Sequence, residues 1–224
     1  MIHAYDDQYL DDAMRCLGEA TDYITSNCGM DMDRFLDLFV STGYARQFAA
    51  GVPKVVSGTS GTELAMDILT KSGILMEFPP AQVSYSYSAQ YWCGWILAYY
   101  QWYSGRSFKD IQSHISMQEI EALYPALHEA SEQKFVDILN DIIRKKELPT
   151  RLQTQRKLSG YSQRELADKV GVNLRTLQQY EIRAKDINKA AGITLLALSK
   201  ALGCQMEDLL EYDTEDRPGS CHLS

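Results

Sequence analysis

The sequence predicts an all-α protein, and three observations support this fold class. Apolar residues recur at the three- and four-residue spacing of a helix face in segments along the whole chain. Two Ser-x-x-Glu sequences, Ser60–Glu63 and Ser162–Glu165, match the capping box that opens helices. The stretch Ser84–Tyr87 alternates like a strand, but it has no second strand to pair with, so we interpret it as an extended loop.

Six or seven helices are expected in the first two-thirds of the chain. The first is predicted over about Tyr5–Asn27 and the second over Asp31–Gly43. Ser60 opens another, which ends at Gly73 because glycine tolerates the left-handed conformation of many helix C-termini. The last helix before the domain junction carries an apolar stripe: Phe135, Ile138, Leu139, Ile142 and Ile143.

An aromatic helix is predicted over Tyr91–Tyr103, which contains all three tryptophans of the chain. One interpretation is that these rings form the core of the N-terminal domain, because aromatic side chains bury large areas. The other is that some of them form a partner-binding surface, since Trp and Tyr are enriched in interface hot spots. We expect Trp95 to be buried beside Gly94 and Trp102 to be the most exposed, near a polar turn. Trp102 and Tyr103 are therefore the predicted partner-binding residues.

Two short helices separated by a tight turn are predicted over Ser162–Glu181. Gly171 ends the first helix, and Asn173 is a suitable N-cap for the second. Leu177 and Tyr180 then face inward. Four side chains of the second helix project outward together: Leu174, Arg175, Gln178 and Gln179. Arginine and glutamine are suited to reading base edges in the major groove of DNA, so the pattern indicates a DNA-binding helix-turn-helix.

The same region resembles the DNA-binding domain of the phage Cro and repressor (XRE-like) family. The resemblance is carried by SQRELADKVGV, LQQYE and TLLALSKALGCQMEDLLE, and it covers roughly Pro149–Glu211. It implies five helices around a small core, a phosphate contact for Gln163, and base reading by the outward side chains after the capping Asn173. It also implies phosphate contacts from three later cations: Arg183, Lys185 and Lys189. The connecting segment IRAKDINKAAGI departs from the family pattern, because it is longer and lacks the customary glycine after the glutamate.

The charge of the chain is distributed unevenly around a net value of −8. Residues 1–143 hold 8 basic and 19 acidic residues, which gives −11, whereas residues 144–200 hold 13 basic and 5 acidic residues, which gives +8. The remaining residues, 201–224, carry −5. Because salt screens charges beyond about 8–10 Å, the basic block can attract phosphates locally while the rest of the chain repels them.

The remaining composition favours a cytoplasmic protein with no cofactor, metal site or catalytic residue. Five cysteines and four histidines are dispersed without the spacing of a disulfide framework or a zinc site. No run reaches the ~20 apolar residues of a membrane helix, and the acidic N-terminus is unlike a signal peptide. His128–Glu132 lacks the H-E-x-x-H spacing of a metalloprotease, and Ser57–Gly61 lacks the lysine of a phosphate-binding loop.

A second resemblance concerns the N-terminal part. The stretches YLDDAMRCLGEATDY, DRFLDLFVSTGYARQFAAG, SGTSGTELA, YWCGWILAYYQW and LYPALHEASEQKFVD look like an uncharacterised all-helical region. That region occurs in Gram-positive bacteria fused to this type of helix-turn-helix, often beside genes of toxin–antitoxin character. The resemblance implies no catalytic residues.

Together these observations predict a helical N-terminal domain over 1–146, a helix-turn-helix domain over 147–212 and an acidic flexible tail over 213–224. The expected function is sequence-specific regulation of transcription, as a repressor, by a homodimer on an inverted-repeat operator of double-stranded DNA. The alternative is an antitoxin-like interaction protein whose N-terminal domain binds a toxin-like protein partner. We expect no membrane association.

Overall fold

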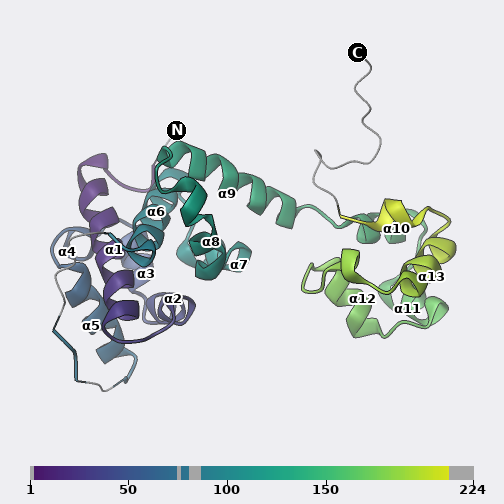
Figure 1. Cartoon of the computed structure of the whole chain (residues 1–224), viewed down its shortest axis with the longest axis horizontal. Coiled ribbons are helices and arrows are strands. Elements are labelled where there is room, and N and C mark those ends of the chain that lie inside the picture. Colours follow the sequence, from purple (N-terminus) through teal and green to yellow (C-terminus); the bar gives the residue numbers. More distant parts are fainter. Residues whose placement is uncertain (1–2, 75–76, 81–86, 212–224) are drawn as a thin grey trace, which may run out of the picture. The chain divides into compact units, whose positions relative to one another are not determined.

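The computed structural model describes residues 3–74, 77–80 and 87–211, and every regular element in these ranges is a helix. The predicted all-α fold class is therefore confirmed; Figure 1 shows the helices in chain order. The chain divides into two compact units, Met1–Ile143 and Arg144–Ser224. The tail predicted over 213–224 lies outside the described residues, as do Ser84, Tyr85 and Ser86 of the predicted extended loop.

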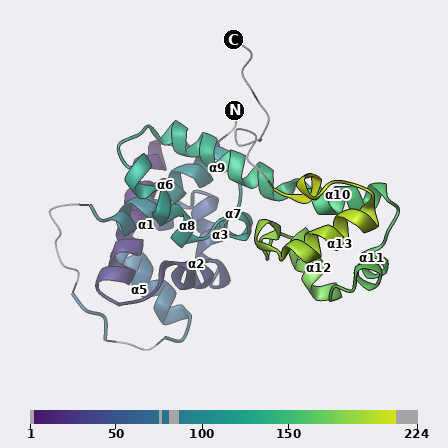
Figure 2. The ribbon, with the colours of Figure 1, turned by 45° about the vertical axis from the view of Figure 1, so that its right-hand side comes forward.

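Helix α1 (Leu10–Ser26) lies at the centre of the first unit and packs against α5 (Gly61–Lys71) and α6 (Ala89–Ser104) (Figures 1 and 2). Glycines make this close packing possible. A Cβ atom added at Gly94 of α6 would lie 2.8 Å from the carbonyl carbon of Leu17 in α1, and one added at Gly61 would lie 2.6 Å from the amide nitrogen of Ala20. The α1 and α6 backbones therefore pack directly on each other, as do those of α1 and the start of α5.

The predicted first helix starts later than expected. Asp6 accepts a hydrogen bond from the amide of Gln8 at 3.1 Å and caps a 3-10 turn, Asp7–Tyr9, before the α-helix begins at Leu10. This Asp-capped turn replaces the expected first α-helical turn, because an aspartate side chain competes for backbone amides near a helix start.

The first unit contains nine α-helices within the described residues, more than the six or seven expected. Helix α2 (Met32–Ser41) is followed by α3 (Tyr44–Ala49) and α4 (Pro53–Val56), and α7 (Phe108–His114) follows α6. Helices α3, α4 and α7 are too short to show a 3.6-residue period. Packing fixes α3 and α7 instead. One phenylalanine from each of them and one from α2 meet edge-on, with ring centroids 5.0–5.7 Å apart, and these are Phe39, Phe48 and Phe108.

The aromatic helix α6 buries its tryptophans differently from the prediction. Trp102, expected to be the most exposed, is only 7% exposed, whereas Trp95, expected to be buried, is half-buried. The indole nitrogen of Trp102 donates to the carbonyl of Tyr5 at 2.9 Å, and His3 stacks on the ring at 3.8 Å. The chain before α1 thus covers the end of α6, a contact over about a hundred residues that helical spacing does not reveal.

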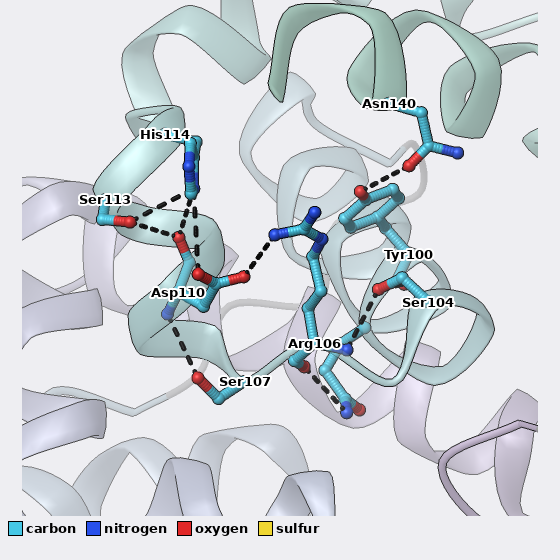
Figure 3. Close-up of polar contacts among 9 residues, drawn as sticks. Tyr100, Ser104, Arg106, Ser107, Asp110, Ser113, His114 and Asn140 are labelled. Carbon is cyan, nitrogen blue, oxygen red and sulfur yellow. Dashed lines mark hydrogen bonds and ion pairs between the residues drawn. The ribbon is translucent and has the colours of Figure 1, made fainter. Parts of the chain in front are cut away.

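Helices α8 (Met117–Leu127) and α9 (Glu132–Glu147) complete the first unit, and the last turn of α9 belongs to the second. Figure 3 shows polar contacts around the second half of α6, including one to α9. The hydroxyl of Tyr100, a fully buried residue, donates to the side-chain oxygen of Asn140 in α9 at 2.8 Å. At the start of α7, Arg106 pairs with Asp110 at 2.7 Å, one helical turn further along the chain.

The second unit is a small bundle with its own core. Its α-helices are α10 (Arg151–Leu158), α11 (Gln163–Val170), α12 (Leu174–Glu181) and α13 (Gly192–Leu202). The fifth helix implied by the resemblance is the 3-10 helix Met206–Leu209, and a further 3-10 turn lies between α12 and α13. Ten buried apolar residues form the core: Leu152, Leu166, Ala167, Leu177, Tyr180, Ile187, Leu195, Leu198, Leu202 and Leu209.

Candidate nucleic-acid interface

The helix-turn-helix of the second unit is set by local capping. The hydroxyl of Ser162 accepts from the Glu165 amide at 3.2 Å while the Glu165 carboxylate accepts from the Ser162 amide at 2.8 Å, which completes the predicted capping box of α11. These hydrogen bonds hold the pKa of the Glu165 carboxyl below its ordinary value. Gly171 ends α11 in the left-handed conformation, with φ 70°. Asn173 then caps α12 by accepting from the Arg175 amide at 2.8 Å.

The inward face of α12 is the one that the sequence predicted, and the outward face differs at Leu174. Leu177 and Tyr180 are buried, while Arg175 and Gln178 are exposed. Gln179 is half-buried, and Leu174 at the start of the helix is half-buried against the core of the unit. Three of the four predicted base-reading side chains, Arg175, Gln178 and Gln179, therefore remain accessible on α12, whereas Leu174 contributes to the core.

A buried ion pair holds α12 in place. Arg156 of α10 donates to both carboxylate oxygens of Glu181, at 2.6 and 3.0 Å, and also to the Tyr161 carbonyl at 2.7 Å. The Glu181 side chain is 0% exposed and that of Arg156 is 10% exposed. Hydrogen bonding to Glu181 raises the pKa of Arg156 above its ordinary value. The first helix of the unit is thereby fixed to the end of α12 by a bidentate pair of the strong kind.

This pair also positions two of the predicted DNA-contacting residues. The side-chain amide of Gln163 donates to Glu181 at 2.8 Å, and the side-chain amide of Gln178 donates to the Gln163 oxygen at 3.3 Å. A hydrogen-bonded chain thus runs from the buried Arg156 to the exposed face of α12. The sequence analysis did not identify Arg156 and Glu181. The signal that could have revealed them is a pair of opposite charges at core-facing positions of α10 and α12.

The three cations after α12 differ in how they are held within the second unit. Arg183 takes the left-handed conformation, with φ 58°, and donates to the Leu148 carbonyl at 2.7 Å. It also pairs with Glu211 at 3.2 Å, so it links the start, the middle and the end of the second unit. The phosphate contact expected of Arg183 stays a prediction, and the contacts within the unit fix where its guanidinium lies. Lys185 stays exposed, with its ammonium 5.4 Å from the Tyr180 ring, and Lys189 pairs with Asp186 at 3.6 Å.

Groups with catalytic chemistry occur elsewhere in the described residues. Figure 3 shows Ser113 and His114 on α7, where both side chains contact the main-chain carbonyl of Asp110, at 2.6 and 2.8 Å. The Ser113 hydroxyl donates to that carbonyl and the two side chains belong to adjacent residues, so the arrangement stabilises the end of a short helix. Burial raises the pKa of the Cys16 and Cys93 thiols to about 12, which keeps both protonated at neutral pH. No group of His, Cys, Asp or Glu side chains in the described ranges is placed to hold a metal ion.

Comparisons with known proteins give one match. Residues 152–209 match the helix-turn-helix family model, and this range runs from the first core residue of α10 to the last residue of the final 3-10 helix. Neither the curated proteins nor the solved structures contain a match to the chain. Among the described helices, none has the length and apolar character needed to cross a membrane. The second unit of this chain is therefore a helix-turn-helix domain of the XRE family of DNA-binding regulators.

Proposed function

We propose that this protein is a sequence-specific repressor of transcription that binds an inverted-repeat operator as a homodimer. The observation that carries the proposal is the exposed Arg175–Gln178 face of α12, fixed from behind by the buried pair of Arg156 with Glu181. Two copies of such a helix read successive major grooves when the dimer places them about one DNA turn, ~34 Å, apart. Binding of such a dimer over a promoter would exclude other proteins from it.

Within this proposal the residues have separate roles. Arg175 and Gln179 contact base edges, with Gln178 and Leu174 beside them, because they belong to the accessible face of the capped helix. We assign a phosphate contact to Gln163 at the start of α11, and further DNA contacts to the exposed Asn173 and Lys185. Phosphate contacts position the domain, whereas base contacts give it sequence preference.

Replacement of Arg175 by alanine tests the base-reading role. The variant should lose about 1–3 kcal/mol of binding free energy on the cognate site and relax base preference at one position. Selection from randomised DNA sites, followed by titration of the selected sites, measures both effects. Lys200→Ala is the matched control, because it removes one exposed positive charge from α13 and leaves α12 unchanged. Unchanged sequence preference in Arg175→Ala would show that α12 is not the recognition helix.

The uneven charge of the chain gives a second expected result. The fragment 144–211 should bind nonspecific DNA at least as well as the full chain, because it lacks the 1–143 block with its charge of −11. Binding should also weaken steeply with salt, since each neutralised phosphate releases counterions. Fluorescence anisotropy at several salt concentrations measures both, with circular dichroism to show that the fragment is folded. A folded fragment that binds far more weakly would contradict local charge as the source of affinity.

An antitoxin-like role of the first unit is a second candidate, and the observation that favours it is the net charge of −11 on residues 1–143. An acidic domain suits a basic protein partner, because complementary charge accelerates and directs association. Tyr103 is half-buried and remains a proposed contact, whereas Trp102 is too deeply buried to offer surface. Co-purification of residues 1–143 with the products of the neighbouring genes tests this role, and recovery of the fragment alone argues against it.

A further inference from the structure

The first unit contains an open pocket of about 350 Å³, lined by the first two turns of α6, the residues just before them, and the end of α8. Pockets that bind small molecules begin at about this size, on the order of 300 Å³. Six of its seven lining residues carry aromatic rings, and these are Tyr87, Tyr91, Trp92, Trp95, Tyr124 and His128. None of the lining residues is a lysine or an arginine.

The rings of the pocket are held by one another and by the core. Tyr87 stacks on Tyr91 with centroids 4.3 Å apart, and Tyr124 stacks on His128 at 4.6 Å. Trp92 meets Tyr124 edge-on, with ring centroids 5.6 Å apart, and also packs against Phe135 of the core at 5.7 Å. The pocket is therefore formed before any ligand arrives, which lowers the entropy cost of binding.

The same rings remain accessible from outside. Tyr87 is 76% exposed, and Tyr91, Trp95 and Tyr124 are half-buried. Burial raises the pKa of the Tyr91 hydroxyl to about 12, so this hydroxyl is neutral at physiological pH. Exposing this many rings around one cavity costs free energy, because aromatic surface left in water forgoes the stabilisation of burial. A ligand that covers the rings would recover it.

Carboxylates lie close to the two polar residues of the pocket lining, Ser88 and His128. Asp22 accepts a hydrogen bond from Ser88, which lines the pocket and caps α6. The Glu129 carboxylate lies 3.7 Å from the His128 ring. Glu121 accepts at 2.6 Å from the side-chain amide of Gln90, a residue of α6 that does not itself line the pocket. The C-terminal end of α8, which carries the negative end of a helix dipole, contributes Tyr124 and His128. The N-terminal end of α6 carries the positive end of its helix dipole and disfavours a cation, but the Asp22 carboxylate offsets part of this effect.

We propose that this pocket binds a small organic cation, an alkylated ammonium group on an apolar or aromatic body. The π faces of Trp and Tyr attract cations electrostatically, and the attraction strengthens where water is excluded. The surrounding carboxylates and the net charge of −11 on residues 1–143 also attract a cation. An anion would meet repulsion, and a neutral apolar molecule would gain only the burial of its surface. The pocket lies wholly within the first unit, so the inference does not depend on how the second unit binds DNA.

Calorimetric titration of the full chain tests the ligand class directly. The probes are phenyltrimethylammonium and its uncharged carbon isostere, tert-butylbenzene, used below its solubility limit. The cation should bind at least about tenfold more tightly, because the two molecules share their shape and differ in charge. Tryptophan fluorescence should change on binding, since Trp92 and Trp95 line the pocket. Equal or tighter binding of the uncharged isostere, or no binding of the cation, would overturn the proposal.

Three variants then locate the site. Trp95→Leu and Tyr124→Leu each remove a π face while keeping apolar volume, and each should weaken the cation at least about tenfold. Tyr99→Leu is the matched control, because Tyr99 is a half-buried aromatic residue of the same helix that does not line the pocket. Thermal unfolding of each variant shows whether the unit is folded, and Tyr124→Leu serves if Trp95→Leu is not. Unchanged affinity in the folded pocket variants, or an equal loss in Tyr99→Leu, would refute this site.

Discussion

Glu181→Ala should destabilise the second unit by about 3–5 kcal/mol, because it leaves the guanidinium of Arg156 buried without its partner. Both partners lie almost entirely out of water, with side chains 10% and 0% exposed, so solvent cannot replace the lost bidentate contact. A domain of this size is stable by only about 5–15 kcal/mol, so the variant should lie close to unfolding. The same change frees Gln163 and weakens DNA binding through a misplaced recognition helix.

Two controls separate the ion pair from a general effect of mutation. Asp168→Ala removes an exposed carboxylate from α11 and should change stability by less than about 0.5 kcal/mol. The double variant Arg156→Met with Glu181→Leu removes both charges and should recover most of the lost stability, since apolar replacement of a buried pair is often neutral or stabilising. Urea unfolding followed by far-ultraviolet circular dichroism measures all three. A Glu181→Ala variant as stable as Asp168→Ala would contradict the proposed anchor.

Gly94→Ala should destabilise the first unit by about 3 kcal/mol, at the upper end of the range for overpacked cores. The added Cβ atom would lie 2.8 Å from the carbonyl carbon of Leu17 and would also meet the Thr21 hydroxyl, so α1 and α6 must move apart. Backbone atoms cannot rotate away from the methyl group as a flexible side chain would. The gain in helix propensity from glycine to alanine, about 1 kcal/mol, offsets only part of this cost.

The position of the tryptophans makes this prediction easy to measure. All three lie in the first unit, so the urea dependence of tryptophan fluorescence follows that unit alone. Gly94→Ala should lower its midpoint and leave DNA binding by the second unit in place. Thr70→Ala is the control, because Thr70 is an exposed residue of α5 in the same unit and its substitution should leave the midpoint nearly unchanged. A fluorescence midpoint for Gly94→Ala equal to that of the wild type would show that the two helices separate without cost.

Contacts that are close in the sequence could be predicted, and this holds best in the second unit. The capping box of Ser162 with Glu165, the end of α11 at Gly171 and the cap at Asn173 each depend on residues at most four positions apart. Helical period alone then separates Leu177 and Tyr180 from the exposed Arg175 and Gln178. The sequence by itself therefore determined the fold class, the helix-turn-helix and the face of α12 that projects from it.

The tertiary structure decided the features that depend on distant residues. Residues 3–5 cover Trp102, which was expected to be the most exposed tryptophan, and Arg183 is bound to Leu148 and Glu211. The pair of Arg156 with Glu181, and the cavity between α6 and α8, likewise join segments 25 or more residues apart. Periodicity shows which face of a helix is apolar, but not which other segment covers it. The packing of the whole unit decides which segment covers each face. In the first unit α1 and α6 meet at Gly94, and the rings that line the pocket stay accessible.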